Sequence, residues 1–269
     1  MLPFERLRYL ARWTDGDGVD LVNEAADCLA AFEGDPAGLV VACRRLLFHH
    51  PASAPLWWLC ARVLASADLG FEAWCAAEEF AHDGTPKRLA TAFQFPSNAP
   101  IAVLGWPDLT SRALTERPDI EVLVVRDGDD AELSMRLRHA ETNVRVITDI
   151  ELQASDSTHL VVEAIASGGG RVLLPEVANE LLPLVQSSGI KIWLVVGLGR
   201  AMPLRLFEAM LRACGDDDSE SDHSFGTKYA VVETGFAERI YGPNGRDSPS
   251  GLFRRFDCPV APELLRLAT

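Results

Sequence analysis

In the first part of the chain, apolar residues recur at the spacing of a helix. Leu21, Ala25 and Leu29 lie four positions apart and would share one helical face. Asp35-Pro36 marks the start of a second helix, because aspartate is a favoured N-cap and proline fits the first helical turn. Similar stripes continue to about residue 93, and short turns separate them. Residues 1–95 are therefore predicted to form a helical domain, a small bundle of four or five amphipathic helices.

The pattern changes at Pro96-Ser97-Asn98-Ala99-Pro100, where short β-branched runs begin to alternate with helical stretches. Apolar strands alternating with helices predict a parallel sheet that helices cover on both faces. Residues 96–269 are therefore predicted to form a Rossmann-like α/β domain with an open, mainly parallel sheet. The predicted strands are 101–104, 121–125, 144–147, 159–162, 191–196 and 229–232. The predicted helices are 108–116, 131–140, 176–187 and 203–214.

Ligands of such sheets bind in the loops at the carboxyl ends of the strands. One of these loops begins with a carboxylate, Glu163, directly after a predicted strand. Burial would raise the pKa of this side chain and suit it to general acid–base chemistry. The alternative is a charged residue that simply leaves the sheet for water. The loops begin at Gly105, Arg126, Thr148, Glu163 and Gly197.

Two glycine clusters suggest phosphate binding. Gly197-Leu198-Gly199-Arg200 follows an apolar strand and precedes a helix, as a dinucleotide-binding loop does. Met202 stands where that motif has its third glycine, so an unspecific anion site at a helix N-terminus beside Arg200 is the better interpretation. Gly168-Gly169-Gly170 is interpreted as a turn, because no Lys-Ser or Lys-Thr pair follows it.

Composition narrows the classes of partner. The net charge is −14, from 25 basic and 39 acidic side chains, and this sign disfavours nucleic acid. The most apolar window, Ile192 to Leu198, is far shorter than the ~20 residues of a membrane-spanning helix, so no membrane partner is expected. The charged start of the chain does not fit a signal peptide. Six cysteines without a C-x-x-C pair favour free thiols in the cytoplasm, with no metal and no cofactor.

The remaining polar groups have weaker patterns. The histidines show no spacing that would pair a base with a nucleophile. Gly215 to Phe225 contains Asp216-Asp217-Asp218 and further acids, and it predicts a solvated loop. A cation site in this loop is the alternative.

Several segments resemble the motifs of one known family, in the same order along the chain. His50 to Trp57 resembles a stretch H-P-x-M-A-P-L-x-N, and Asp83-Gly84-Thr85 resembles a D-G-T motif. His159 to Ile165 resembles D-x-V-L-V-G-A-D-A-I, and Phe256 to Leu265 resembles a closing F-D-x-x-P-P-E-L-I-T. The family comprises the alpha, beta and delta subunits of eukaryotic translation initiation factor 2B and related sugar-phosphate isomerases.

This resemblance implies a helical domain followed by a Rossmann-like domain, and dimers formed through the latter. The enzymes of the family isomerise an aldose phosphate to a ketose phosphate, and they include methylthioribose-1-phosphate isomerase and ribose-1,5-bisphosphate isomerase. The regulatory members bind nucleotides or sugar phosphates without turnover.

The sequence differs from the isomerases at the positions that match their catalytic and phosphate-binding residues. Gly105-Trp106-Pro107-Asp108 lacks the isomerase cysteine, and Glu163 stands in place of an aspartate. Leu174 to Ala178 lacks the Lys, Gly and Thr of the family's phosphate-binding helix start. Arg126-Asp127-Gly128-Asp129 replaces a stretch with an anion-binding arginine, whereas Gly199-Arg200 keeps one positive charge. An isomerase needs a proton shuttle and a phosphate anchor together, so these losses argue against catalysis.

These observations favour a cytoplasmic, homodimeric binding or regulatory protein that senses a nucleotide or a sugar phosphate without turnover. One alternative is a divergent aldose–ketose isomerase with Glu163 as its acid/base, and another is a scaffold whose dimer surface is its function. We expect Arg200 to face an anion and Trp106 to stack on a ring. The predicted ligand-binding residues are Gly105, Trp106, Arg126, Gly197, Gly199 and Arg200.

Overall fold

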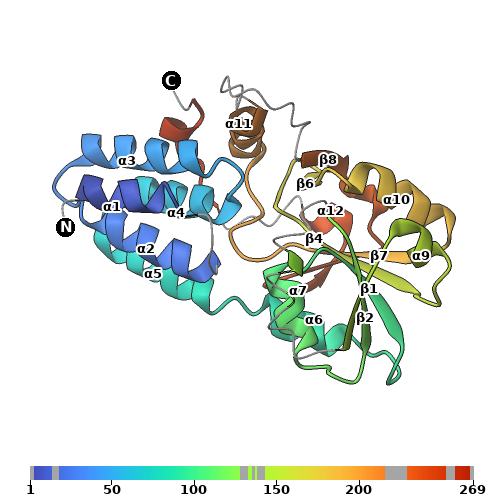
Figure 1. The fold of residues 1–269 in the computed structure, drawn as a ribbon. Coiled ribbons are helices and arrows are strands. Elements are labelled where there is room, and N and C mark those ends of the chain that lie inside the picture. Colours follow the sequence, from blue (N-terminus) through green and yellow to red (C-terminus); the bar gives the residue numbers. More distant parts are fainter. Residues whose placement is uncertain are drawn as a thin grey trace.

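The computed structural model describes residues 3–13, 18–127, 133–134, 137, 143–215, 229–252 and 258–266. Its first part is a bundle of helices that lies beside a sheet (Figure 1). The bundle confirms the helical character predicted for this part of the chain, and it includes a first helix that the pattern did not indicate. The helices are α1 (Pro3–Leu10), α2 (Gly18–Ala30), α3 (Pro36–His49), α4 (Ala54–Ala65) and α5 (Leu69–Ala81).

Aspartates determine where α3 and α5 begin. Asp35 Oδ1 accepts a hydrogen bond from the backbone N–H of Gly38 (2.9 Å), and Asp68 Oδ1 accepts one from that of Phe71 (3.0 Å). Each bond satisfies a backbone donor that the first turn of a helix leaves without an intrahelical partner. The N-cap predicted at Asp35 is therefore confirmed.

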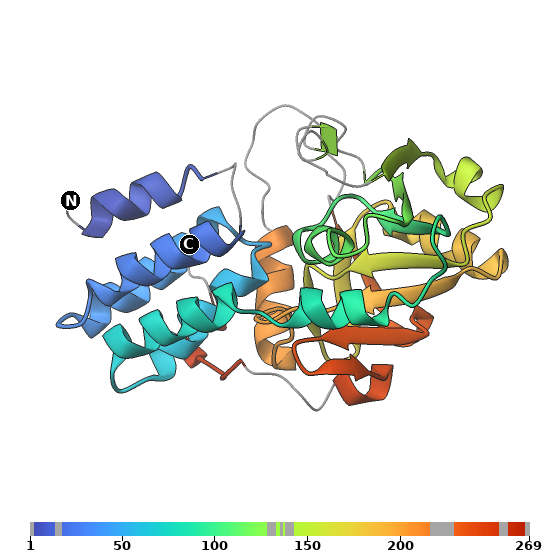
Figure 2. The same cartoon turned by 90° about the horizontal axis from the view of Figure 1, so that it is seen from below.

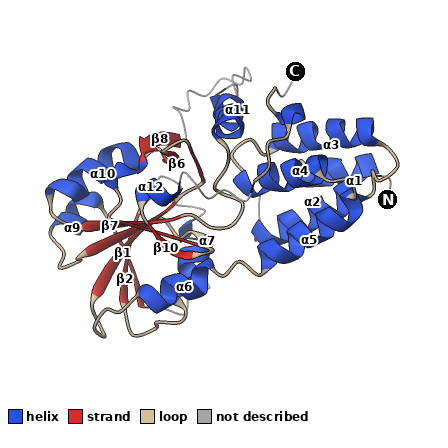
Figure 3. Cartoon of the chain, turned by 180° about the vertical axis from the view of Figure 1, so that it is seen from behind, coloured by secondary structure: helices blue, strands red, loops and turns tan. Residues whose placement is uncertain are grey.

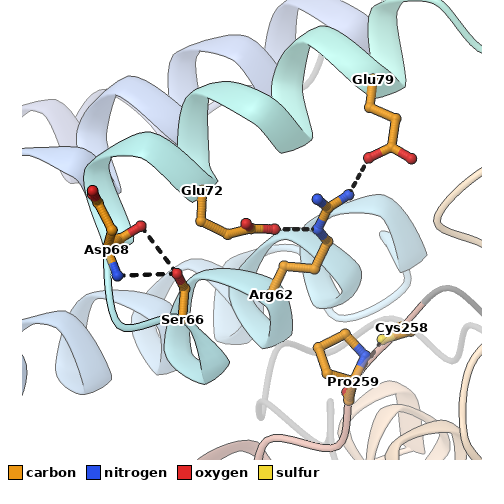
Figure 4. A network of polar contacts seen from close by, with 7 residues as sticks. All are labelled: Arg62, Ser66, Asp68, Glu72, Glu79, Cys258 and Pro259. Atoms are coloured by element: carbon orange, nitrogen blue, oxygen red, sulfur yellow. Dashed lines mark hydrogen bonds and ion pairs between the residues drawn. The ribbon is translucent and has the colours of Figure 1, made fainter.

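An arginine connects α4 to α5. Arg62 of α4 forms ion pairs with Glu72 and Glu79 of α5 (Figure 4). Its guanidinium carbon lies 4.8 Å from the centre of the Trp58 ring, which is fully buried. These contacts fix the position of the two helices relative to each other, in addition to the apolar packing beneath them.

The second part of the chain contains a seven-stranded sheet with the order β10-β9-β7-β4-β1-β2-β3. Its strands run parallel except for β10, which is antiparallel to β9, so the predicted open and mainly parallel sheet is confirmed. The order of the six parallel strands is that of a doubly wound nucleotide-binding fold. The strands are β1 (Pro100–Leu104), β2 (Glu121–Val125), β3 (Asn143–Ile147), β4 (His159–Glu163), β7 (Lys191–Val195), β9 (Arg239–Gly242) and β10 (Gly245–Asp247).

Helices cover both faces of this sheet, as predicted (Figure 3). The side chains of β1 alternate between the faces: Ile101 and Val103 pack towards one pair of helices, and Ala102 and Leu104 towards the other. Because both faces are buried, the central strands are continuous apolar runs. The first pair of helices is α6 (Thr85–Ala92) and α7 (Asp108–Leu114), and the second is α9 (Asp149–Gln153) and α10 (Ala178–Ser187).

The strand predicted at 229–232 does not belong to the parallel sheet. It is β8 (Tyr229–Glu233), which pairs antiparallel with β6 (Arg171–Pro175) in a second sheet of order β5-β6-β8. A β-branched run identifies a strand but not its partner, which explains the error. Gly169 and Gly170 both have positive φ and form the tight turn between β5 (Ala166–Gly168) and β6, so the turn predicted there is confirmed.

The sixth parallel strand is β9, which the sequence pattern did not predict. It is four residues long, begins with a charged residue and ends with a glycine, so it has no apolar run. β10 and α12 (Pro249–Leu252) have the same weakness and were also missed, whereas β6 was missed despite its short apolar run. Of the helix predicted at 131–140, only residues 133, 134 and 137 are described, and they are helical.

Two segments from the second part of the chain complete the core of the bundle. α11 (Leu204–Gly215) lies between bundle and sheet, where it buries Phe207 and Met210 (Figure 2). Residues 258–264, which end in a short 3₁₀ helix at Pro262–Leu264, add Cys258 and Leu264 to the same core. Conversely, Leu89 of α6 belongs to the core of the sheet. The division of the chain at residue 95 stays a prediction.

Within the described ranges, every helix is too short or too polar to cross a membrane.

Candidate functional site

A cavity of about 140 Å³ opens beside the carboxyl ends of β1 and β4. From β1 the chain continues to β2 on one side, and from β4 it continues to β7 on the other side. Ligands of doubly wound sheets bind where the strand order reverses in this way. A cavity of this size holds about one six-membered ring. The described residues of its wall are Leu104, Trp106, Pro107, Asp127, Leu133, Glu163, Ile165, Pro175 and Arg200.

Glu163 is the last residue of β4, and its side chain is buried in this wall. Its Oε2 accepts hydrogen bonds from the backbone N–H of Thr110 (3.0 Å) and from the Thr110 hydroxyl (3.1 Å). Its Oε1 lies 2.8 Å from Nη2 of Arg200. That contact is an ion pair rather than a directed hydrogen bond, since Oε1 has no partner with hydrogen-bond geometry. Both oxygens of the carboxylate therefore face donors of the protein itself.

Burial raises the pKa of Glu163 above its ordinary value. The positive charge of Arg200 and the two hydrogen bonds from Thr110 act in the opposite direction, while the neighbouring carboxylate of Asp108 adds to the rise. The raised pKa that burial predicts for the acid/base candidate Glu163 is therefore confirmed. However, contacts within the protein already occupy its carboxylate.

Arg200 points inward from the loop that follows β7. Its Nη1 donates a hydrogen bond to the backbone oxygen of Ala164 (2.6 Å), and its Nη2 faces Glu163. Only 17% of its side chain is exposed. The anion that we expected opposite Arg200 is therefore present within the protein, as the Glu163 carboxylate.

The bundle helps to position the loop that carries Arg200. The backbone N–H of Leu198 donates to Asp83 Oδ2 (3.0 Å), and Asp83 Oδ1 accepts from the backbone N–H (2.9 Å) and hydroxyl (2.6 Å) of Thr85. Gly199 has a φ of +72°, and a Cβ there would lie 3.3 Å from the Trp58 ring. A larger residue at Gly199 would be strained and would press against the bundle.

Of the residues predicted to bind a ligand, Trp106 and Arg200 line the cavity, together with Glu163. Gly105 lies between the wall residues Leu104 and Trp106 but does not itself line the cavity. It has a φ of +63°, and a Cβ there would collide with the side chain of Asp127, so only glycine fits without rearrangement.

Besides Gly105, three further predicted ligand-binding residues do not belong to the described wall. Arg126 is exposed, and its charge acts on Glu151, whose pKa is lowered chiefly by hydrogen bonds from Thr148. Gly197 and Gly199 line a different cavity of about 40 Å³, next to β9 and β10. The glycine loop therefore presents its glycines away from Glu163 and only its arginine towards it.

Two polar residues of the site were missed by sequence reasoning. Thr110 lies in the first turn of α7, where a threonine has no distinctive pattern. Asp83 belongs to the Asp83-Gly84-Thr85 stretch, which the sequence indicated as the end of a helix and as a family resemblance, but not as a contact of the loop after β7.

The acidic loop lies largely outside the described residues, since 216–228 are not described, and the cation site considered there stays untested. His139 and His223 also lie outside them. Among the residues that are described, no group of three or more His, Cys, Asp or Glu side chains could hold a metal ion.

No protein-family model matches the sequence, and no curated protein is similar to it at the level of sequence. Solved structures are similar in fold. The crystal structure of eIF2B beta from Chaetomium thermophilum has a TM-score of 0.64 at 13% identity, over 93% of this chain and 89% of that one. Translation initiation factor eIF-2B from Pyrococcus horikoshii OT3 has a TM-score of 0.70 at 14% identity, over 91% and 96% of the two chains.

An enzyme has the same fold. 5-Methylthioribose 1-phosphate isomerase from Pyrococcus horikoshii OT3 has a TM-score of 0.65 at 14% identity, over 94% of this chain and 87% of that one. The likeness extends over nearly the whole of each chain, so it includes both the bundle and the sheet. The resemblance noted in the sequence is thereby confirmed at the level of the fold, which this chain shares with subunits of initiation factor 2B and with that isomerase.

Proposed function

We propose that this protein binds a sugar phosphate or a nucleotide in the cavity beside β1 and β4 and does not convert it. The observation that carries this proposal is the engagement of Glu163 on both carboxylate oxygens by Thr110 and Arg200. A general acid or base must be free to exchange a proton with the ligand at hydrogen-bond distance. A carboxylate held in this way serves to connect β4, α7 and the Arg200 loop.

The composition of the wall also supports binding without turnover. The described residues of the cavity wall include no cysteine, and four of the six cysteines, Cys28, Cys43, Cys60 and Cys258, are buried in the core of the bundle instead. Trp106 packs in the core of the sheet and also contributes its ring to the wall, against which a sugar or a base can lie. The sensing of a small molecule requires such a surface but no proton shuttle.

The alternative function is a divergent aldose–ketose isomerase with Glu163 as its acid/base. The specific observation in its favour is the pKa of Glu163, which burial raises towards the range that proton transfer at neutral pH requires. In that case the Arg200–Glu163 pair would have to open when a substrate binds.

A binding assay combined with a conversion assay tests the proposal. The panel is ribose 5-phosphate, ribose 1,5-bisphosphate and AMP, each beside its dephosphorylated parent. Binding is followed by thermal shift and calorimetry, and aldose-to-ketose conversion by NMR. We expect saturable stabilisation without conversion. Conversion would establish the isomerase instead, and an absence of binding across the panel would contradict both and favour the scaffold.

Two tryptophan variants provide a matched test of the site. Trp106→Ala removes a ring from the cavity wall, whereas Trp74→Ala removes a ring from the surface of α5, where 62% of the side chain is exposed. We expect Trp106→Ala to weaken ligand binding on the order of tenfold, as the loss of one stacking contact does, and Trp74→Ala to leave it unchanged.

We further propose that the protein is a cytoplasmic homodimer that associates through residues 96–269. One structure with this fold is a tetrameric eIF2B-beta2-delta2 complex, so the fold is compatible with assembly. Light scattering coupled to size exclusion measures the state in solution. A monomer at micromolar concentration would contradict the dimer.

A further inference from the structure

Glu163 occupies the position in the cavity wall at which an anion would be bound. Two donors and a cation converge there: the backbone N–H and the hydroxyl of Thr110 lie 3.0 and 3.1 Å from Oε2, and Nη2 of the Arg200 guanidinium lies 2.8 Å from Oε1. Two neutral donors and a guanidinium form the arrangement that proteins use for carboxylates and phosphates. Here the carboxylate belongs to the chain itself.

The positive charge of Arg200 is neutralised by Glu163 within this arrangement. Its Nη2 faces Glu163 and its Nη1 is held by the backbone oxygen of Ala164, so two of its nitrogens have internal partners. The Glu163 side chain is only 1% exposed, which weakens solvent screening around the pair. A second anion beside Arg200 would gain little attraction, because Glu163 already neutralises the charge of this arginine. Glu163 would also repel that anion at short range.

We infer that Glu163 is a built-in anion that makes the cavity selective for an uncharged group of its ligand. The inference rests on the proposed function and deepens it: the sugar or base of the ligand enters between Trp106 and Arg200, and its phosphate stays outside the cavity and contributes little affinity. Glu163 is thus a specificity-determining residue. It replaces the acid of an isomerase with an internal counter-ion.

Removal of the built-in anion tests the inference, because it vacates the position between the donors. Glu163→Ala is titrated with acetate and with inorganic phosphate at constant ionic strength, and thermal stability and calorimetric binding are measured. We expect both anions to bind this variant on the order of tenfold more tightly than they bind the wild type, since they regain charge-assisted hydrogen bonds.

The matched control is Glu238→Ala. Glu238 also pairs with a cation, since its Oε2 lies 3.6 Å from Lys191 Nζ, but it lies at the opposite end of the strands and is partly exposed. This variant changes the net charge by the same amount, and we expect no gain of anion binding. An equal gain in both variants would mean a general charge effect and would overturn the inference.

A second variant keeps the test decisive if Glu163→Ala does not fold. Glu163→Gln preserves the shape of the side chain and frees the charge of Arg200, so inorganic phosphate should stabilise it more than it stabilises the wild type. If the wild type binds phosphate as tightly as the folded variants do, Arg200 is already available and the inference is wrong. These probes do not require the natural ligand, so their result is independent of the ligand panel.

In that panel, the inference predicts that the wild type binds each phosphorylated compound no more tightly than its dephosphorylated parent. A large phosphate contribution in the wild type would overturn the inference and leave the proposed binding function intact. If none of the panel compounds binds, the proposed binding function fails, whereas the anion titration of the Glu163 variants still tests the inference.

Discussion

The carboxyl ends and the amino ends of β4 and β7 are built in contrasting ways. At their carboxyl ends, β4 and the loop after β7 supply Glu163 and Arg200 to the wall of a cavity. Towards their amino ends, the same strands supply His159 and Trp193 to a cluster of rings with centres about 5 Å apart: 4.9 Å between these two and 5.0 Å from Trp193 to Tyr241. One end is filled with aromatic side chains, and the other keeps space beside a buried ion pair.

This contrast separates residues that stabilise the sheet from residues that can receive a ligand. Aromatic clusters bury a large apolar area and gain from ring-to-ring contacts. A buried ion pair gains little net stability, because the desolvation of both charges offsets their attraction. The raised pKa of Glu163 agrees with this view, since it indicates that burial works against the charged carboxylate. The pair therefore contributes little to the net stability, which agrees with the proposed role of Glu163 in the selection of a ligand.

The largest expected effect is at the aromatic end. Trp193 is buried and contacts rings on both sides, including Phe93, whose ring is stacked 6.1 Å away. Trp193→Ala should lower the free energy of unfolding by about 4 kcal/mol, because it leaves a cavity in the core. Urea denaturation measures this loss, and ligand binding by the folded variant should not change. A loss below about 1 kcal/mol would mean that the cluster contributes little.

The next effect is at the cavity end. Arg200→Met removes the charge partner of a carboxylate whose side chain is 1% exposed, and it should cost about 3 kcal/mol. The double variant Arg200→Met with Glu163→Leu removes both charges and should recover most of that loss. Chemical denaturation of the single and double variants gives the comparison. If the double variant is no more stable than Arg200→Met, an uncompensated charge is not the cause of the loss.

A smaller effect is expected where the bundle holds the Arg200 loop. Asp83→Asn weakens the bonds from Leu198 and Thr85 to a buried carboxylate and should cost about 1.5 kcal/mol. Asp68→Asn is the matched control, since asparagine caps a helix about as well as aspartate does. Equal losses in the two variants, measured by thermal denaturation, would argue against a special role for Asp83.

The smallest effect concerns pH. The pKa of Glu163 is raised above 4.5 in the folded state, so between the two pKa values the folded state holds more protons than the unfolded state. The contribution of Glu163 to stability is therefore fully favourable below pH 4.5 and declines as the pH rises towards the folded pKa. The stability of the wild type minus that of Glu163→Gln should decline over the same range. A difference that increases with pH would contradict the raised pKa.

The sequence predicted correctly those features of the fold that depend on residues close together in the chain. Apolar runs identified the strands at 101–104 and 121–125, because buried parallel strands are continuous in apolar character. Asp35-Pro36 identified the start of α3 for an equally local reason. Even Glu163 could be placed, since it directly follows such a run.

The contacts of the site could not be predicted, because they join residues that are distant in the chain. Glu163 lies 53 positions from Thr110, and Asp83 lies 115 positions from Leu198. Their meeting depends on the strand order, and that order was hidden in part by β9, whose four residues have no apolar pattern. For the same reason Arg200 was expected to face an external anion, although its partner was already within the chain.

The return of residues 258–264 to the helical core has a consequence for synthesis on the ribosome. Cys258, Ala261 and Leu264 pack among side chains of helices that leave the exit tunnel well before them. These helices must therefore wait, with part of their apolar surface uncovered, until residues 258–264 have also been synthesised. The bundle is synthesised before residues 258–264 but is completed only by them, so termination ahead of that segment would leave an exposed apolar surface for chaperones and proteases to recognise.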